Sequence, residues 1–219
     1  MNDDQVRDDV DGAALRPPRG PLSRRGLLLG GGVGALALLA AACGNDDEGD
    51  DEGASGGKPG DLDAAKVAAS LEVLAVNTYQ AALDGATAGS LGAVPPAVAA
   101  FATTALAHHK AHLESWNGVL TGADEEAVTA PPEALAASIN ERFATVTDVA
   151  GVAAIALELE QTAAATYLLV VPALTDPGAI TLAAQMHAVD MQHVAVLLFV
   201  AGEYPVPDTF AQKDKAFVP

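Results

Sequence analysis

The chain has 219 residues, enough for one domain of ordinary size with appendages. Hydrophobic residues make up 50% of it but aromatic residues only 4%, so its core must consist mainly of Ala, Val and Leu. Such a core favours close-packed helices and argues against an all-β sandwich. The formal net charge of -18 repels phosphate groups, so we expect no nucleic-acid partner. The single cysteine, Cys43, excludes an intramolecular disulfide and a zinc site built of thiolates.

An apolar segment at 26–42 follows Arg24 and Arg25 and ends directly before Cys43. This pattern is typical of an export signal. The paired arginines resemble the bacterial twin-arginine signal, and small residues before a lone cysteine resemble a lipobox, whose cysteine is acylated. We therefore expect 1–43 to direct export and Cys43 to anchor the protein in the membrane, on the outer face of the cytoplasmic membrane or in the cell envelope. The alternative is a short membrane-spanning anchor in which the cysteine is incidental.

Residues 44–60 are rich in Gly and acidic side chains and nearly free of apolar ones, which predicts a solvated tether. From residue 61 onward, apolar periodicity interrupted by Gly and Pro predicts a folded domain at 61–203. We expect four long helices at 62–84, 96–120, 148–171 and 178–201, a connection at 123–147 with a short helix opening near Pro132, and an extended tail at 204–219. Thr147 or Asp148 is the expected cap of the third long helix.

The first and third long helices share one sequence pattern, Leu-Glu-x-x-Ala-x-x-Thr-Tyr, which begins at Leu71 and again at Leu159. This repetition predicts a duplicated helical hairpin. The second and fourth long helices then correspond through His109 and His112 in one and Asp190 and His193 in the other. Because residues three apart lie on one helical face, each pair forms a two-ligand unit.

Glu72 and Glu160, the acids of the repeated pattern, are flanked at helical spacing by apolar residues and so point into the bundle. A buried carboxylate needs a cation, strong hydrogen bonds or a proton. No Lys or Arg lies between Arg142 and Lys213, so the third and fourth long helices hold no permanent cation. Histidine or a metal ion is therefore the natural partner of these acids.

With these residues in place, the domain resembles the ferritin-like superfamily, within the group of exported bacterial ferritin-like domain proteins. In that fold, two helices each give one Glu and two others each give Glu-x-x-His to a dinuclear iron or manganese site. The resemblance implies an all-α, antiparallel four-helix bundle with a long crossover between the second and third long helices. The implied metal ligands are Glu72, His109, His112, Glu160, Asp190 and His193. Tyr79 and Tyr167 would orient the carboxylates among them.

Two ligand positions depart from the family pattern, because His109 stands where Glu is expected and Asp190 is shorter than Glu. Three carboxylates neutralise two divalent ions incompletely, and a neutral imidazole cannot bridge two ions. The sequence therefore leaves open a dinuclear, a mononuclear or a lost site. It also leaves open a metal-free layer in which Glu72 and Glu160 bond to the tyrosines or histidines. Two other histidines, His108 and His187, are expected in the core or at its rim rather than as ligands.

Two functional hypotheses follow. The first is an exported protein that binds iron or manganese and performs redox chemistry with dioxygen or peroxide, as the resemblance implies. The second is a metal-free interaction or stress-protection domain at the cell surface. Hydrolase and phosphate-binding motifs are absent from the sequence. A closed iron-storage shell is disfavoured by the lipid anchor, and the oligomeric state, a dimer included, stays open.

Overall fold

The computed structural model describes residues 59–219, and the predicted export signal, with Arg24, Arg25 and Cys43, lies outside them. The described residues form four long α-helices, one shorter α-helix and one turn of 3-10 helix. In chain order these are α1 (Pro59–Ala88), α2 (Pro96–Gly122), α3 (Glu133–Phe143), α4 (Val149–Val170), η1 (Val171–Ala173) and α5 (Pro177–Val200).

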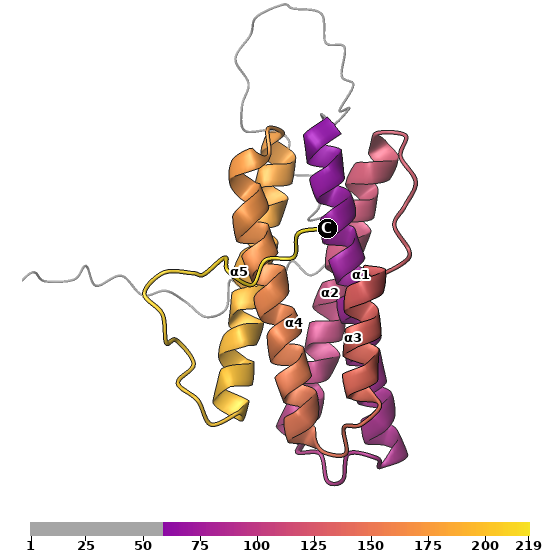
Figure 1. Ribbon diagram of the computed structural model, residues 1–219, viewed down its shortest axis with the longest axis vertical. Coiled ribbons are helices and arrows are strands. Elements are labelled where there is room, and N and C mark those ends of the chain that lie inside the picture. The colour runs from indigo at the N-terminus through magenta and orange to yellow at the C-terminus, as the bar shows by residue number, and fades with distance from the viewer. Residues whose placement is uncertain (1–58) are drawn as a thin grey trace, which may run out of the picture. The chain divides into compact units, whose positions relative to one another are not determined.

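The four long helices form two antiparallel hairpins (Figure 1). Helix α1 packs along α2, and α4 packs along α5, while α1 also contacts α4 and α2 contacts α5. Helix α3 lies in the connection between α2 and α4 and packs on α4. This arrangement confirms the predicted all-α bundle with a long crossover between the second and third long helices.

Helix starts follow the capping residues of the sequence. The carboxylate of Asp148 accepts a hydrogen bond from the backbone N–H of Gly151 at 2.8 Å, and Asp176 accepts one from Ala179 at 2.8 Å. These side chains satisfy backbone donors that a helix start leaves unpaired. Of the two predicted caps of α4, Asp148 is therefore the one the structure uses. Pro177 occupies the first position of α5, where its missing N–H costs nothing.

Helix α1 is longer at both ends than the predicted 62–84. It continues through Gly85 and ends before Gly89, whose φ of 74° lies in the left-handed region. A glycine inside a helix costs only about 1 kcal/mol relative to Ala, so neighbouring Ala residues carry the helix past Gly85. The helix stops only where glycine adopts a left-handed φ.

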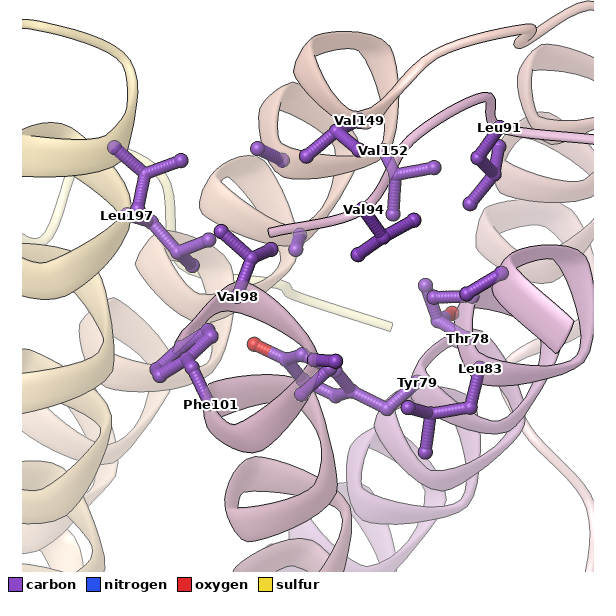
Figure 2. A pocket seen from close by; sticks show the side chains of 17 residues that line it. Thr78, Tyr79, Leu83, Leu91, Val94, Val98, Phe101, Val149, Val152 and Leu197 are labelled. Carbon is purple, nitrogen blue, oxygen red and sulfur yellow. The ribbon is translucent and has the colours of Figure 1, made fainter. Parts of the chain in front are cut away.

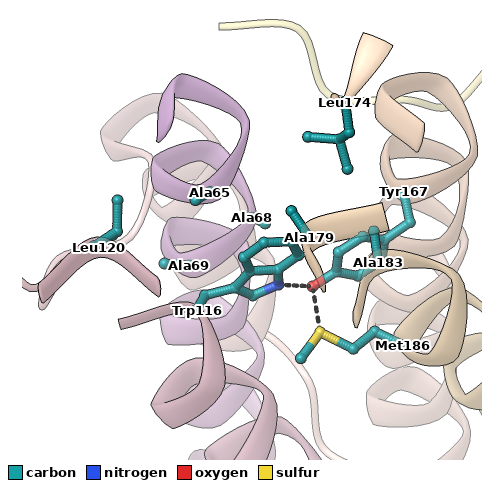
Figure 3. Packing of buried hydrophobic residues seen from close by; sticks show 10 residues of the cluster. All are labelled: Ala65, Ala68, Ala69, Trp116, Leu120, Tyr167, Leu174, Ala179, Ala183 and Met186. Atoms are coloured by element: carbon teal, nitrogen blue, oxygen red, sulfur yellow. Dashed lines mark hydrogen bonds between the residues drawn. The ribbon is translucent and has the colours of Figure 1, made fainter. Parts of the chain in front are cut away.

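The bundle core differs between its two ends. At the end near the α1–α2 loop, apolar side chains from the four long helices surround a pocket (Figure 2). At the other end, Trp116 and Tyr167 stack with ring centroids 6.2 Å apart (Figure 3). Ala65, Ala68 and Ala69 of α1 pack in the same cluster. These small residues on α1 leave room for the rings of Trp116 and Tyr167, so the few large aromatic side chains fill the space beside the alanines.

One described stretch, Val149–Ala173, is long and apolar enough to cross a membrane by length and composition. Half of its most apolar window, 50%, is buried against the rest of the protein. It also carries a buried acid, Glu160. These features are those of a core helix in a bundle.

The tail after α5 contains neither helix nor strand over 201–219. Its end returns to α4, where the backbone N–H of Phe217 donates to the Thr166 hydroxyl at 2.9 Å. The Lys215 ammonium donates to the Gln161 side chain. The end of the tail therefore lies against the outside of α4.

Candidate metal site

The six predicted ligands lie together inside the bundle, contributed by all four long helices. Glu72 comes from α1, Glu160 from α4, and a pair three residues apart from each of α2 and α5. All six are buried, and the most exposed, His112, is 9% accessible. Helical spacing places each pair on one face, and the antiparallel hairpins bring the four faces together.

His109 lies between the two glutamates. Its Nδ1 is 2.7 Å from Oε2 of Glu72, and its Nε2 is 3.0 Å from Oε1 of Glu160. Since a carboxylate only accepts hydrogen bonds, an imidazole that bonds both must donate from both nitrogens and is then protonated. His109 thus supplies a positive charge where the family pattern has a carboxylate.

The two tyrosines of the repeated pattern bond across the bundle rather than within their own helices. Tyr79 of α1 donates to Oε1 of Glu160 at 2.5 Å, and Tyr167 of α4 donates to Oε1 of Glu72 at 2.5 Å. Each hydroxyl therefore orients the carboxylate of the other hairpin. This exchange reflects the internal repeat, because both halves make the same bond.

Two residues that the sequence analysis did not assign to the site contact Tyr167. The indole N–H of Trp116 donates to the Tyr167 hydroxyl at 2.9 Å, and that hydroxyl lies 3.3 Å from the sulfur of Met186 (Figure 3). Trp116 follows His112 by four residues, and Met186 precedes Asp190 by four. Spacing of this kind on the faces that carry the ligands is the signal that could have found both.

His108 links the buried network to the surface. Its Nδ1 lies 3.0 Å from Nε2 of His193, and the two rings stack with an interplanar angle of 11°. Nδ1 of His193 is in turn 3.1 Å from Oε1 of Glu160. His108 itself is exposed, so it belongs to the rim and not to the core.

Asp190 and His112 are buried without hydrogen-bond partners of their own. Both oxygens of Asp190 lack a partner, as do Nδ1 of His112 and Oε2 of Glu160. Nδ1 of His112 is 3.5 Å from Glu72 and 3.9 Å from Asp190, too far for a hydrogen bond. Buried polar atoms are normally paired, so this cluster calls for an additional partner.

Comparison with protein-family models matches residues 60–203 to the ferritin-like domain, more than half of the chain. The chain belongs to the ferritin-like family. Comparisons with curated proteins and with solved structures gave no match.

The buried acids and His109 of this ferritin-like core shift one another's pKa values. Burial alone would lower the pKa of His109, but the charges of Glu160 and Glu72 and the hydrogen bonds to both hold it well above its usual range. Burial would raise the pKa of either glutamate, but His109 outweighs it and lowers each to about 2. Asp190 behaves oppositely, because burial and the nearby charges of Glu72 and Glu160 raise its pKa well above the usual value. Both causes favour the protonated form of Asp190 over the charged form.

The donor atoms fall into two groups, within each of which they lie no more than 4.8 Å apart. One group contains His109, Glu160, Asp190 and His193, and the other contains Glu72, His109 and His112. Carboxylate oxygens and imidazole nitrogens are ligands that iron and manganese accept. Three of the four unpartnered atoms, Oε2 of Glu160 and both oxygens of Asp190, belong to the first group. The ferritin-like core thus fits a divalent ion best in the group of four.

Two titratable residues near the ligands in sequence take no part in either group. Glu158 is exposed and pairs with Arg142 at 2.6 Å, as expected for a solvated face. His187 is half-buried, and its Nδ1 lies 2.9 Å from the backbone oxygen of Ala164. His187 therefore lies at the rim of the core, one of the two places predicted for it.

Proposed function

We propose that this ferritin-like protein binds iron or manganese in the bundle core and uses it for redox chemistry with dioxygen or peroxide. The observation that carries the proposal is the set of buried, unpartnered oxygens on Asp190 and Glu160. The imidazolium of His109 reaches only Oε1 of Glu160, so these three oxygens remain unsatisfied unless a further cation binds. Two carboxylates also match the charge of one divalent ion.

One ion belongs in the group of His109, Glu160, Asp190 and His193. A neutral imidazole offers a single lone pair, so His109 ligates through one nitrogen while the other donates to a carboxylate. With Nε2 as the ligand, Nδ1–H keeps its bond to Glu72. The group of Glu72, His109 and His112 is then a weaker position for a second ion.

The bound ion supplies one-electron redox chemistry. The surrounding residues hold its ligands in place. Tyr79 fixes the orientation of Glu160, and Tyr167, itself held by Trp116, fixes that of Glu72. Such outer partners fix ligand geometry in metal sites generally.

The test is metal stoichiometry by elemental mass spectrometry on chain purified without chelators and loaded anaerobically with ferrous or manganous ion. We expect one tightly bound ion per chain, and its loss in Glu160→Gln. Glu158→Gln is the matched control, since it changes the same residue type on the same helix at an exposed position. An unchanged metal content in Glu160→Gln would exclude the ligand set.

A metal-free interaction or stress-protection domain is the second candidate, favoured by the bonds from His109 to both glutamates. In that case the imidazolium itself neutralises the buried acids. The absence of bound ion after anaerobic loading would select this candidate.

We further propose export and lipid anchoring, which the paired Arg24 and Arg25 and the lone Cys43 support. The corresponding experiment is fractionation of cells that express Cys43→Ser. We expect this variant to leave the membrane fraction, and a variant with both arginines changed to Lys to stay inside the cell.

A further inference from the structure

The apolar pocket at the α1–α2 end of the bundle has a volume of about 50 Å³. Residues of helices α1, α2, α4 and α5 and of the α1–α2 loop line it (Figure 2). Its walls include Ala82, Leu83, Val94, Val98 and Leu197. The pocket therefore occupies the end of the same four-helix interior that holds the candidate ligands.

No side chain that lines the pocket offers it a free hydrogen-bond donor. Only Thr78 and Tyr79 among the lining side chains carry a hydroxyl. The Thr78 hydroxyl donates to the backbone oxygen of Leu74 at 2.8 Å, and that of Tyr79 donates to Glu160 at 2.5 Å. A buried water needs two to four polar partners, so the pocket favours an apolar guest over water.

Pocket size restricts the guest further. An apolar cavity of about 150 Å³ stays dry and admits benzene or xenon, whereas one water needs about 10–15 Å³. The pocket lies between these values. A diatomic molecule or a single large atom fits it, and an organic ring does not.

Two aromatic rings separate the pocket from the candidate metal site. Tyr79 and Phe101 line the pocket and meet edge to face at 6.2 Å between centroids. On their other side, Tyr79 stacks on His109 at 5.5 Å, and Phe101 meets His193 edge-on at 5.7 Å. A guest in the pocket is thus one ring away from two candidate ligands.

We propose that this pocket binds dioxygen and delivers it to the metal site, which makes dioxygen and not peroxide the substrate. The proposal rests on the metal-binding function proposed above. Peroxide carries two hydroxyl groups, and the lining side chains offer them no free donor and only the oxygens of two hydroxyls that already donate elsewhere. Dioxygen needs none.

The test is nuclear magnetic resonance of the full chain, stripped of metal and held under dioxygen pressure. Dissolved dioxygen is paramagnetic and accelerates the relaxation of methyl groups near which it resides. We expect the methyl groups of Val98 and Leu197 to relax at least about threefold faster than those of Val119, at the other end of α2. Xenon, as a second probe, should show one saturable site.

Filling the pocket should remove this effect. Val98→Phe narrows its wall and Ala82→Leu occupies its interior, and either should abolish the excess relaxation and xenon binding. Val119→Phe is the matched control, because it makes the same change on the same helix away from the pocket. Uniform relaxation across the methyl groups, or excess relaxation that survives both filled variants, would overturn the proposal.

These readouts need no bound ion, so they are separate from the metal stoichiometry. Dioxygen in the pocket of a chain that binds no metal would refute the proposed function and not the pocket. A chain that binds metal but shows no excess relaxation would refute the pocket alone. On the metal-loaded chain, the filled variants should raise the dioxygen concentration for half-maximal ferrous oxidation at least about fivefold, and Val119→Phe should not.

Discussion

His109 determines the chemistry of the buried site, because each of its nitrogens faces a different glutamate. A protonated ring satisfies both acids but has no lone pair for a metal. A neutral ring can ligate an ion and still donate to one carboxylate. Proton and metal therefore compete for the same residue, and the competition sets how binding depends on pH.

Metal binding should release protons. The pKa values of His109 and Asp190 both lie well above their usual ranges, so the metal-free core favours the protonated form of each, and an ion that binds both must displace those protons. The apparent affinity should therefore rise with pH, by about tenfold per pH unit for each proton released. Calorimetry of manganese binding at pH 6 and 7, in two buffers of different ionisation enthalpy, measures this. Equal affinity at both pH values and equal heats in both buffers would contradict it.

The Tyr167 hydroxyl accepts a hydrogen bond from Trp116 and donates one to the buried Glu72. In Tyr167→Phe, the Trp116 N–H and an oxygen of Glu72 lose a partner inside the core. Hydrogen bonds to charged groups contribute about 1.5–3 kcal/mol, so we expect a similar loss in the free energy of unfolding, measured in urea. Tyr204→Phe, at a side chain that is 70% exposed, should change it by less than about 0.5 kcal/mol. Similar values for the two variants would show that the buried hydroxyl is not structural.

His108 contacts the candidate ligand His193 and belongs to neither candidate ligand group. If Nδ1 of His193 ligates the ion beside Glu160, its Nε2–H donates to His108. Loss of such an outer partner typically weakens metal binding by about 10–100-fold. His108→Ala should therefore keep the metal stoichiometry and lose at least about tenfold in affinity, measured by competition with a chelator. His187→Ala is the control, and an equal loss there would assign the effect to packing.

The candidate ligands could be predicted from the sequence because helical spacing determines which residues share a face. The tyrosine bonds could not, since Tyr79 lies on the helix of Glu72 but bonds Glu160. That choice depends on the relative register of two hairpins, which spacing within one helix does not encode. His108 was missed for the same reason, because only the approach of α5 gives it a partner.

At the scale of whole helices, Asp61 connects the start of α1 to the start of α5. Its carboxylate accepts hydrogen bonds from the backbone N–H groups of Thr175 and Asp176, at 2.9 and 2.8 Å, and from the Thr175 hydroxyl at 3.0 Å. The residues are more than a hundred positions apart in sequence. This bond set joins the two hairpins at the end of the bundle opposite the apolar pocket.

Removal of this link should destabilise the bundle. Asp61 is 2% exposed, and Asp61→Ala leaves the backbone N–H groups of Thr175 and Asp176 without this acceptor. We expect a loss of about 2–4 kcal/mol in the free energy of unfolding, measured by chemical denaturation. Asp63→Ala removes an exposed acid from the same turn and should cost less than about 0.5 kcal/mol. Equal stabilities of the two variants would contradict the assigned role.

Helix existence was predictable from periodicity, but helix ends were less so. The start of α5 agrees with its Asp-Pro-Gly signal, because a cap and a first-turn proline act locally. The end of α1 does not agree, since Gly85 and Gly89 look alike in sequence and only Gly89 has a positive φ. Which glycine ends a helix depends on the loop that follows, where Ser90 N–H bonds back to the Gly85 oxygen at 3.1 Å.

At the scale of the whole molecule, the site lies where the two halves of the repeat meet. Each hairpin contributes an acid, a tyrosine and a pair of potential ligands, and each tyrosine bonds the acid of the other half. The halves differ at one position, because α2 has His109 where α5 has Asp190. The His109 imidazolium bonds the glutamates of both halves, whereas Asp190 of α5 lacks a partner. A bound ion would therefore lie nearer to α5.

Asp190 should then lower the free energy of unfolding of the metal-free protein and raise that of the metal-bound protein. In the metal-free fold, burial and the charges of Glu72 and Glu160 raise the pKa of Asp190, so folding disfavours its charged form, a cost that the unfolded chain does not bear. Asp190→Asn removes this cost and should raise the free energy of unfolding of the metal-free protein by about 2 kcal/mol at pH 7. With saturating manganese the order should reverse, since only the wild type gains about 4 kcal/mol at a thousandfold excess over the dissociation constant.

This reversal can be read from four thermal melts, wild type and Asp190→Asn with chelator and with manganese. For a domain of this size, about 2 kcal/mol corresponds to a shift in Tm of about 4–8 °C, well within measurement. Asp208→Asn, an exposed change in the tail, should follow the wild type in both conditions. If Asp190→Asn is less stable than the wild type with chelator, the acid has a structural partner in the metal-free fold. A buried acid that lowers stability until an ion arrives is the behaviour expected of a metal ligand.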